Sequence, residues 1–384
     1  MKRIVIKFGG TSVGSIKKII NAAKIIKKRH EENNEVIVVV SAMSGTTDDL
    51  INRSRQVSDS FNKTELDVLM SSGEQISSSL LAGAIIELGI KARSWLGWQI
   101  PILTNDNHAS SQIMQIKTDE ILNFISQKGI AVIAGFQGVS KDSRITTLGR
   151  GGSDLSAVAI AKFFQTDSCE IYTDVEGILT TDPSINKNAK KIDKISYEEM
   201  LEMSSLGAKV MQPSAVQTAM TNNISVHVRS TFSRKSGTKI ISESDIDNRR
   251  VVTGIAYSKK NAKVSIVGVV DKPGVAADVF EPIGKNNINI DMVIQNTSLD
   301  GKNANITFTI KQEDLNKTLS IIEKNREKLN FNKITHDDKL AKVSIIGAGM
   351  ISESGVTHKM FRSLAEEKIN ILAISTSEIK ISVL

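Results

Sequence analysis

Strand-like and helix-like patterns of apolar residues alternate over the first two-thirds of the chain. Residues 3–8 (RIVIKF) read as a buried strand. Residues 35–43 (EVIVVVSAM) read as a second one with a continuous β-branched run, as is typical of strands covered on both faces of a parallel sheet. Residues 15–31 carry isoleucine at helical spacing, and 64–89 continue the helical pattern. Residues 131–139 read as another strand. The alternation predicts a βαβ series with ligand-binding loops at the strand ends.

The series continues to about residue 240, and a repeat follows it. We expect a helix at 154–165 and a strand leading into a loop at 168–179. Composition changes at 243–250 (ESDIDNRR). Beyond it, AKVSIVGVVDKPGV from Ala262 and AKVSIIGAGMISESGV from Ala341 lie about 79 residues apart, and each predicts a strand, a glycine loop and a helix. Two copies predict a paired α+β module, because a solenoid needs at least about three repeats.

Composition is that of an ordinary globular protein. The chain has 384 residues, 40% of them hydrophobic and 24% charged, which allows two or three domains. A single cysteine, Cys169, excludes an intrachain disulfide and a zinc cluster of cysteines. No signal-peptide pattern opens the chain, and no apolar run approaches the roughly 20 residues of a membrane span. We therefore expect a cytoplasmic protein.

The net charge of +7 raises the question of a nucleic-acid partner. The lysines are scattered, as in KKIINAAKIIKKRH, and only 4% of residues are aromatic. A nucleic-acid footprint needs clustered charge and aromatic side chains for stacking. We expect neither a nucleic-acid nor a membrane partner, and the charge suits the attraction of a small anionic substrate.

The stretch KFGGTSVG, residues 7–14, follows the first predicted strand directly. Adjacent glycines let backbone N–H groups approach phosphate oxygens without a Cβ in the way, and Lys7 adds a compact positive charge. The spacing is not that of a Walker P-loop. The motif predicts an anion site, with a tight turn as the alternative.

A second glycine-rich stretch, LGRGGSD at 148–154, surrounds Arg150. A guanidinium forms a planar fork that suits a carboxylate. Ser153 and Asp154 stand at the predicted start of a helix, where anions are favoured. The alternative is that Ser153 or Asp154 only caps that helix.

Three further positions are candidates for ligand contacts. Glu74 lies among small polar residues in SSGEQ, which suggests a ligand packed nearby, although an isolated helical glutamate usually faces solvent. Asp174 belongs to TDVEGILTTDP (173–183), which also reads as a turn built from Asp and Thr side chains. Lys209, in GAKVM, offers a second cation for phosphate.

The motifs KFGGTSV, SAM, SSGEQ, GRGGSD, TDVEGILTTDP and GAKVM, in this order, resemble the aspartate kinase family of the amino-acid kinase superfamily. Residues 262–384 resemble that family's pair of ACT regulatory modules. The resemblance implies an α/β protein: a three-layer αβα amino-acid-kinase fold with a mostly parallel sheet, followed by two α+β, ferredoxin-like ACT modules. The implied domains are 1–246, 247–330 and 331–384.

The resemblance implies transfer of the γ-phosphoryl group of ATP to the side-chain carboxylate of L-aspartate, giving 4-phospho-L-aspartate, the first step of lysine, threonine and methionine biosynthesis. A carboxylate with an ordinary pKa near 3.9 is already an ionised nucleophile, so no general base is needed. Mg²⁺ would be held mainly by ATP oxygens rather than by a protein metal site. The implied catalytic residues are Lys7, Gly9, Gly10, Asp174 and Lys209. Those on the aspartate side are Ser41, Thr47, Glu74, Arg150, Ser153 and Asp154. Those on the nucleotide side are Lys7, Phe8, Gly9, Gly10, Thr173, Asp174, Thr180, Asp182 and Lys209.

The ACT pair implies feedback control by lysine, threonine or both, and a homodimer or higher homo-oligomer formed through these modules. The implied effector residues are Asp271, Gly274, Val275, Asn289, Ile290 and Gln295 in the first repeat. In the second they are Gly355, Val356, Asn370, Ile371, Ser377 and Glu378. The alternatives are that DKPG is simply a β-turn and that the modules serve only for association.

The chain departs from the family's common pattern at three places: Ser184, Pro213-Ser214 and SESGV at 352–356. Two other functions stay open at this point. One is a related kinase acting on glutamate, N-acetylglutamate, carbamate or UMP, and the other is an amino-acid-binding regulator without catalytic turnover.

Overall fold

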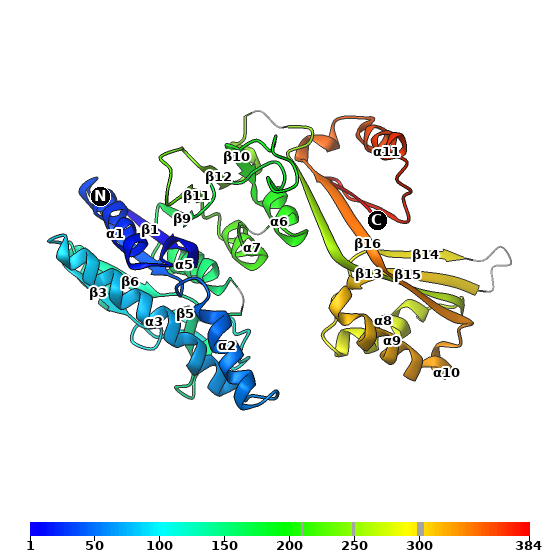
Figure 1. Ribbon diagram of the computed structural model, residues 1–384, viewed down its shortest axis with the longest axis horizontal. Helices are drawn as coiled ribbons and strands as arrows, with labels where there is room; N and C mark the ends of the chain where they lie inside the picture. Colours follow the sequence, from blue (N-terminus) through cyan, green and yellow to red (C-terminus); the bar gives the residue numbers. More distant parts are fainter. Residues whose placement is uncertain (150, 209, 248–249, 298–302) are drawn as a thin grey trace. The chain divides into compact units, whose positions relative to one another are not determined.

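The computed structural model describes residues 1–149, 151–208, 210–247, 250–297 and 303–384 (Figure 1). They divide into two compact units, Met1–Gly254 and Ile255–Leu384. Two predicted site residues, Arg150 and Lys209, lie outside the described residues. Within the described ranges, no helix combines the length and the apolar character needed to cross a bilayer.

An eight-stranded sheet forms the centre of the first unit. Its pairs are parallel except for the antiparallel β11–β12 pair. In spatial order the strands are β10 (Lys194–Ser196), β12 (Thr238–Ile241), β11 (Val226–Ser230), β9 (Ser168–Thr173), β1 (Lys2–Phe8), β2 (Asn34–Val40), β6 (Ile130–Ala134) and β3 (Ala92–Trp95). The mostly parallel sheet predicted from the sequence is confirmed.

Helices cover both faces of this sheet. The helices of the unit are α1 (Ile16–Glu31), α2 (Thr46–Val57), α3 (Lys63–Glu87), α4 (Asp119–Ser126), α5 (Gly152–Phe163), α6 (Tyr197–Ser205) and α7 (Pro213–Thr221), with short 3₁₀ turns η1 (Gly10–Ser12) and η2 (Glu243–Asp245). Ile19 of α1 and Leu81 of α3 pack with Ile4, Ile6 and Val38 in one core cluster. Helix α5 packs against β1, β2 and β9, and its Ser153 lies beside Val39, whose side chain points to the other face. The result is the expected three-layer arrangement.

A second, smaller sheet lies beside the large one. Its order is β5 (Ile113–Ile116), β4 (Ile102–Thr104), β7 (Gln137–Val139) and β8 (Ile145–Thr147). The single strand predicted at 131–139 is therefore wrong in detail, because β6 and β7 belong to different sheets. The chain turns between them at Phe136, whose φ of 68° lies in the left-handed region.

The second unit contains both sequence repeats in one six-stranded sheet. The order is β14 (Val293–Thr297), β15 (Asn303–Lys311), β13 (Gly254–Val270), β16 (Lys333–Ile346), β18 (Lys380–Val383) and β17 (Ile374–Thr376). The long strands that open the two repeats, β13 and β16, are central neighbours. The remaining elements are α8 (Val275–Lys285), η3 (Gln312–Asp314), α9 (Leu315–Lys324), α10 (Arg326–Leu329), η4 (Ala348–Ile351) and α11 (Val356–Glu366). The repeats thus form one paired α+β module, as predicted.

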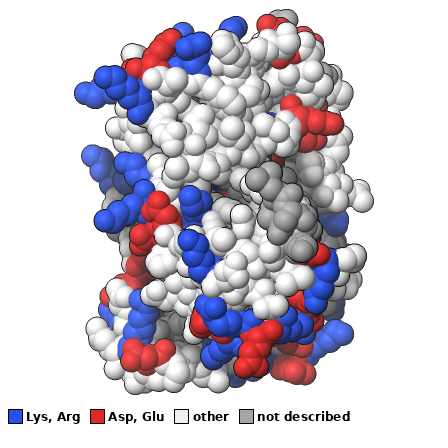
Figure 2. All heavy atoms as spheres, turned by 90° about the vertical axis from the view of Figure 1, so that its right-hand side faces the viewer, with Lys and Arg blue, Asp and Glu red and all other residues white. Residues whose placement is uncertain are grey.

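Charged side chains of both signs lie together on the face drawn in Figure 2. In the second unit, Lys285 pairs with Glu281 at 2.7 Å and Lys328 with Asp278 at 2.9 Å. On this face the basic residues are interspersed with carboxylates and do not form one continuous basic patch.

Candidate active site

The carboxyl ends of β1, β2, β6 and β9 meet at one edge of the large sheet, because parallel neighbours end on the same side. Backbone hydrogen bonds join the loops that leave them. The N–H of Gly9 donates to Tyr172 O (3.1 Å), that of Ser44 to Gly10 O (3.1 Å), and that of Gly135 to Val40 O (3.0 Å). The loops therefore form one connected rim at the edge where α/β proteins bind ligands.

A cavity of about 550 Å³ opens at this rim. Six of the predicted site residues line it: Lys7, Gly10, Ser41, Thr47, Glu74 and Ser153. They come from β1, η1, the loop after β2, α2, α3 and α5. A cavity of this size is in the range that holds a small-molecule ligand.

Lys7 brings a buried positive charge to the cavity. The residue is 8% exposed, and its Nζ lies 2.5 Å from Oδ1 of Asp154 at the start of α5. An ion pair this buried fixes the direction of the ammonium group, because neither charge can turn to bulk water. Asp154, predicted on the aspartate side, therefore also orients Lys7.

Gly10 is required by the packing of the rim. A Cβ on Gly10 would lie 2.8 Å from the carbonyl oxygen of Ala42, closer than real contacts allow. This close approach of two backbones gives a structural reason for the second glycine of the motif and brings η1 beside Ser41.

The first turn of α5 lies at the cavity wall, where the N–H of Gly152 donates to Gly149 O at 2.9 Å and that of Asp154 to Gly151 O at 3.0 Å. The N-cap is Gly151, with φ of 71° and no side-chain cap, so the capping alternative for Ser153 and Asp154 is wrong. A side chain at Gly151 would also collide with Gln212. Gly151, Gly152 and Ser153 all line the cavity, so the positive end of the helix dipole faces any ligand there.

Glu74 supplies a carboxylate oxygen without a partner among the described residues. The residue is 3% exposed; Oε1 accepts the N–H of Ala42 at 3.0 Å, while Oε2 has no hydrogen-bond donor. Burial raises the pKa of Glu74 from 4.5 to about 7, because desolvation disfavours the charged form. A cationic ligand group beside Oε2 would offset that cost. The solvated-face alternative for Glu74 is wrong.

The small residues around Glu74 have a packing role. A Cβ on Gly73 would lie 2.8 Å from the Cβ of Ala42, and the hydroxyl of Ser77 donates to Ser41 O at 2.7 Å. They let α3 approach the loop after β2. The ligand-packing explanation therefore applies to Glu74, which lines the cavity, and not to Gly73 or Ser77.

The raised pKa of Glu74 predicts a stability difference that depends on pH. Between about pH 4.5 and 7 the folded chain keeps this proton and the unfolded chain has lost it, so stability falls as pH rises through that window. Above pH 7 the cost is roughly 3 kcal/mol, at 1.36 kcal/mol per pKa unit. Glu74→Gln keeps the hydrogen bond from the N–H of Ala42 and has no ionised carboxylate to bury, so it lacks this loss of stability. The free energy of unfolding of Glu74→Gln minus that of the parent, measured by urea unfolding, should increase from pH 5 to pH 8. A difference that does not change with pH would contradict this.

The predicted nucleotide-side residues follow β9 along the same edge of the sheet. Asp174 is exposed, and Oδ1 accepts the hydroxyl of Thr173 at 3.1 Å. Asp182 Oδ1 accepts the N–H and the hydroxyl of Ser184 at 2.8 and 2.6 Å, which is the turn expected as the alternative. Thr180 accepts the N–H of Lys190 at 3.0 Å. These residues lie outside the cavity lining, and their nucleotide role stays a prediction.

The predicted effector residues include a glycine and a valine that have the same local structure in both repeats. Gly274 and Gly355 adopt φ of 94° and 88° and precede the buried Val275 and Val356 at the starts of α8 and α11. In the first repeat, the hydroxyl of Thr297 makes a long 3.4 Å hydrogen bond to Asp271, so the loop lies beside β14. The other candidates are Asn289, Ile290, Gln295, Asn370, Ile371, Ser377 and Glu378, and the effector role of the whole set stays a prediction.

Several lining residues carried no recognisable motif. They belong to elements and loops that are distant from one another in sequence: Gly45, Asp48, Ala109, Phe136 and Gln212. The polar run NDNHASSQ at 105–112 was the available signal for Ala109, because binding residues are disproportionately carried by polar surface loops.

Comparisons with known proteins agree with this architecture. The model of the amino acid kinase family matches residues 2–230, and an ACT domain model matches residues 264–325 and 343–384. An aspartate kinase of Pseudomonas putida is 44% identical over 384 residues, covering 100% of this chain and 93% of that protein. Aspartokinase 2 of Bacillus subtilis is 43% identical over 382 residues, with the same coverage.

Solved structures show the same fold. Aspartokinase III of E. coli in complex with aspartate and ADP (R-state) superposes with a TM-score of 0.84 at 24% identity, covering 100% of this chain and 96% of that one. Its complex with lysine and aspartate (T-state) gives 0.75 at 25% identity, with equal coverage. The chain belongs to the amino acid kinase family and, within it, to the aspartate kinases. The resemblance and the fold class predicted from the sequence are confirmed.

Proposed function

We propose that the chain transfers the γ-phosphoryl group of ATP to the side-chain carboxylate of L-aspartate, in the cavity at the carboxyl edge of the large sheet. The observation that carries the proposal is that one cavity contains groups that bind anions and a group that binds a cation. Lys7 and the α5 N-terminus receive anions, and the unpartnered Oε2 of Glu74 receives a cation. An amino acid with two carboxylates and one ammonium group presents both the anions and the cation that these groups bind.

Substrate binding uses the two ends of the cavity. Glu74 accepts the α-ammonium group, which removes the cost of a buried unpartnered oxygen. Ser41, Thr47 and Ser153 offer hydroxyls around the substrate, and Arg150, outside the described residues, is assigned to the α-carboxylate by the family pattern. The ionised side-chain carboxylate then points at the rim and needs no general base.

Catalysis is positioning and charge neutralisation. The two reacting groups are both anions, so Lys7, the N–H group of Gly10 and the positive end of the α5 dipole must offset their repulsion as the phosphoryl group moves. Mg²⁺, bound to the phosphates, supplies further charge neutralisation. The described residues contain no group of three His, Cys, Asp or Glu side chains able to hold an ion alone, and an ion carried on phosphate oxygens needs none.

On the nucleotide side, Asp174→Asn should raise the KM for ATP about tenfold and leave the KM for aspartate unchanged. Asp174 follows β9 beside the glycine rim, where its charge can order groups that face the phosphates. Initial rates against ATP at saturating aspartate provide the measurement. Asp142→Asn, an exposed carboxylate in the β7–β8 turn, is the control. Equal KM values for ATP in the two variants would remove Asp174 from the nucleotide site.

For the second unit we propose feedback control by lysine, threonine or both, and assembly into a homodimer or higher homo-oligomer. The lysine complex of E. coli aspartokinase III supports the first. The second is supported by apolar side chains near the end of the second repeat: Ile369, Leu372 and Ile374 are 54%, 46% and 43% exposed. The cytoplasmic location expected from the sequence stays a prediction.

A panel of acceptors tests the function. The purified chain is incubated with ATP, Mg²⁺ and hydroxylamine, which traps an acyl phosphate as a hydroxamate. ADP release is measured for every acceptor, because UMP would give a phosphoanhydride that hydroxylamine does not trap. L-Aspartate should give hydroxamate and ADP, and L-glutamate, N-acetylglutamate, carbamate and UMP should release no ADP above the acceptor-free blank. A better acceptor in the panel would overturn the substrate assignment, and no turnover with any of them would favour a non-catalytic regulator. Adding lysine or threonine to the same assay tests the proposed feedback inhibition.

A further inference from the structure

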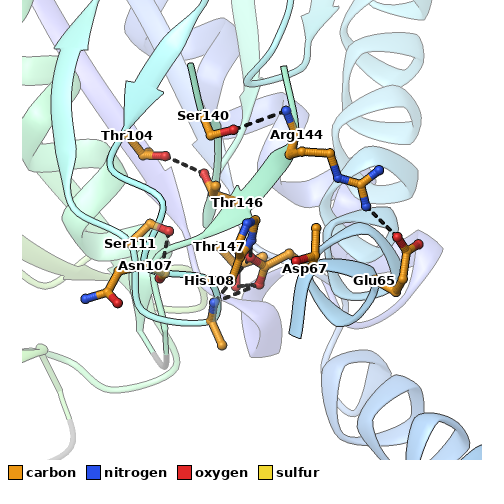
Figure 3. A network of polar contacts seen from close by, with 12 residues as sticks. Glu65, Asp67, Thr104, Asn107, His108, Ser111, Ser140, Arg144, Thr146 and Thr147 are labelled. Carbon is orange, nitrogen blue, oxygen red and sulfur yellow. Dashed lines mark hydrogen bonds and ion pairs between the residues drawn. The ribbon is translucent and has the colours of Figure 1, made fainter. Parts of the chain in front are cut away.

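A buried carboxylate on α3 holds a loop that forms part of the cavity wall. Asp67 is 0% exposed and lies two helical turns before Glu74. Its oxygens accept the N–H of Ala109 at 3.1 and 3.2 Å and the hydroxyl of Thr147 at 2.5 Å, and Nδ1 of His108 lies 2.7 Å from Oδ2. Figure 3 shows Asp67, His108 and Thr147 converging from a helix, a loop and a strand.

The loop between β4 and β5 depends on these contacts. Ala109 has φ of 67°, a left-handed conformation that is unfavourable for a residue with a Cβ. Such a conformation persists only where the surroundings hold it. Asp67 binds its N–H, and the N–H of Ser111 donates to Thr147 O at 2.9 Å.

The held loop lies against the glycine stretch that begins α5. Ala109 and Gly149 both line the cavity, and a Cβ on Gly149 would lie 3.3 Å from the carbonyl oxygen of Ala109. Thr147 is two residues before Gly149, so Asp67 contacts both sides of this junction. One carboxylate thus ties α3, which carries Glu74, to the segment that carries Arg150 and Ser153.

Building on the proposed function, we propose that Asp67 is a positioning residue for the amino-acid substrate. With His108 and Thr147 it fixes the distance between Glu74, which receives the ammonium group, and the start of α5 at Gly151–Ser153, whose positive helix end receives the α-carboxylate. Binding both ends of a short substrate at once requires that distance to be held closely, because a shift of about 1 Å can cost a hundredfold. Of the described nucleotide-side candidates, Thr173, Asp174 and Thr180 make none of these contacts.

Asp67→Asn tests the proposal. The amide keeps the size of the carboxylate but turns one acceptor into a donor that faces N–H and O–H donors. The KM for aspartate should rise about tenfold or more, with kcat at saturation within about threefold and the KM for ATP within about twofold of the parent. A general loss of structure would instead lower the concentration of active enzyme, and with it the apparent kcat, and would leave both KM values unchanged.

A matched control is the buried hydroxyl pair of Thr146, on β8 next to Thr147, and Thr104 on β4. The hydroxyls of Thr104 and Thr146 pair at 2.6 Å, and both residues are buried, at 3% and 0% exposed. Thr146 precedes Thr147, so its side chain points to the opposite face of β8 (Figure 3). The double variant Thr104→Val/Thr146→Val removes both partners of that bond and should leave the KM for aspartate unchanged.

A second variant keeps the test decisive if Asp67→Asn does not fold. Thr147→Val removes one of the donors to Asp67 at nearly constant volume and should raise the KM for aspartate several-fold. The inference is overturned if a folded Asp67→Asn or Thr147→Val enzyme keeps the parental KM for aspartate, or if the KM for ATP rises equally. An inactive parent enzyme would instead contradict the proposed function.

Discussion

Replacing Lys7 by methionine is expected to lower kcat about a thousandfold. Methionine keeps the length and volume of the side chain and removes the charge that faces the cavity. Removing a charge or donor that stabilises a transition state costs about 10² to 10⁵ in rate in comparable sites, and a thousandfold corresponds to about 4 kcal/mol. Steady-state assays with ATP and aspartate, both saturating, provide the measurement.

Stability must be measured beside activity, because Lys7 is paired. Lys7→Met leaves Asp154 buried without its partner at 2.5 Å, a loss of about 3 to 5 kcal/mol for a buried pair. The double variant Lys7→Met/Asp154→Asn removes both charges and should recover much of this stability while staying inactive. Lys7→Met with more than a tenth of the parental kcat would contradict the assigned role.

The second large effect is expected at Glu74. Glu74→Gln keeps the hydrogen bond to the N–H of Ala42 and removes the negative charge offered to the substrate's ammonium group. A hydrogen bond to a charged group contributes about 1.5 to 3 kcal/mol, so the KM for aspartate should rise about 10- to 100-fold with the KM for ATP unchanged. Initial rates against aspartate at saturating ATP measure this.

The pH profile separates this role from a packing defect. Because the pKa of Glu74 is raised to about 7, the parent should bind aspartate less tightly as pH falls below 7, and Glu74→Gln should lack that dependence. Gln75→Ala is the control, since Gln75 is the next residue on α3 and does not line the cavity. A Glu74→Gln enzyme with the parental KM and pH profile would exclude Glu74 from the aspartate site.

The large elements could be predicted from the sequence because each carries a long, regular pattern. The strands β1 and β2 are buried on both faces, so apolar residues dominate them, and the helices α1 and α3 are long enough for their period to show. The site edge followed from topology, since motifs after parallel strands meet at one edge. The structure itself shows that Lys7, at the end of β1, pairs with Asp154 at the start of α5, although the two residues are distant in sequence.

The remainder depends on contacts that have no local pattern. The break between β6 and β7 comes from one left-handed residue, Phe136. The small residues around Glu74 resembled a ligand surface because tight helix–loop packing selects the same side chains. Asp67 and Ala109 are 42 residues apart, and only the folded chain shows that one carboxylate holds the cavity wall.

A structure with L-aspartate and a non-hydrolysable ATP analogue bound together is the most direct test of the central claim. We predict the amino acid in the 550 Å³ cavity, with its ammonium group at Glu74 Oε2 and its side-chain carboxylate near Lys7 Nζ. The terminal phosphate should lie on the other side of Lys7, at the Gly9–Gly10 rim. Either ligand bound away from Lys7, or an aspartate turned so that its side chain points away from the phosphate, would contradict the account.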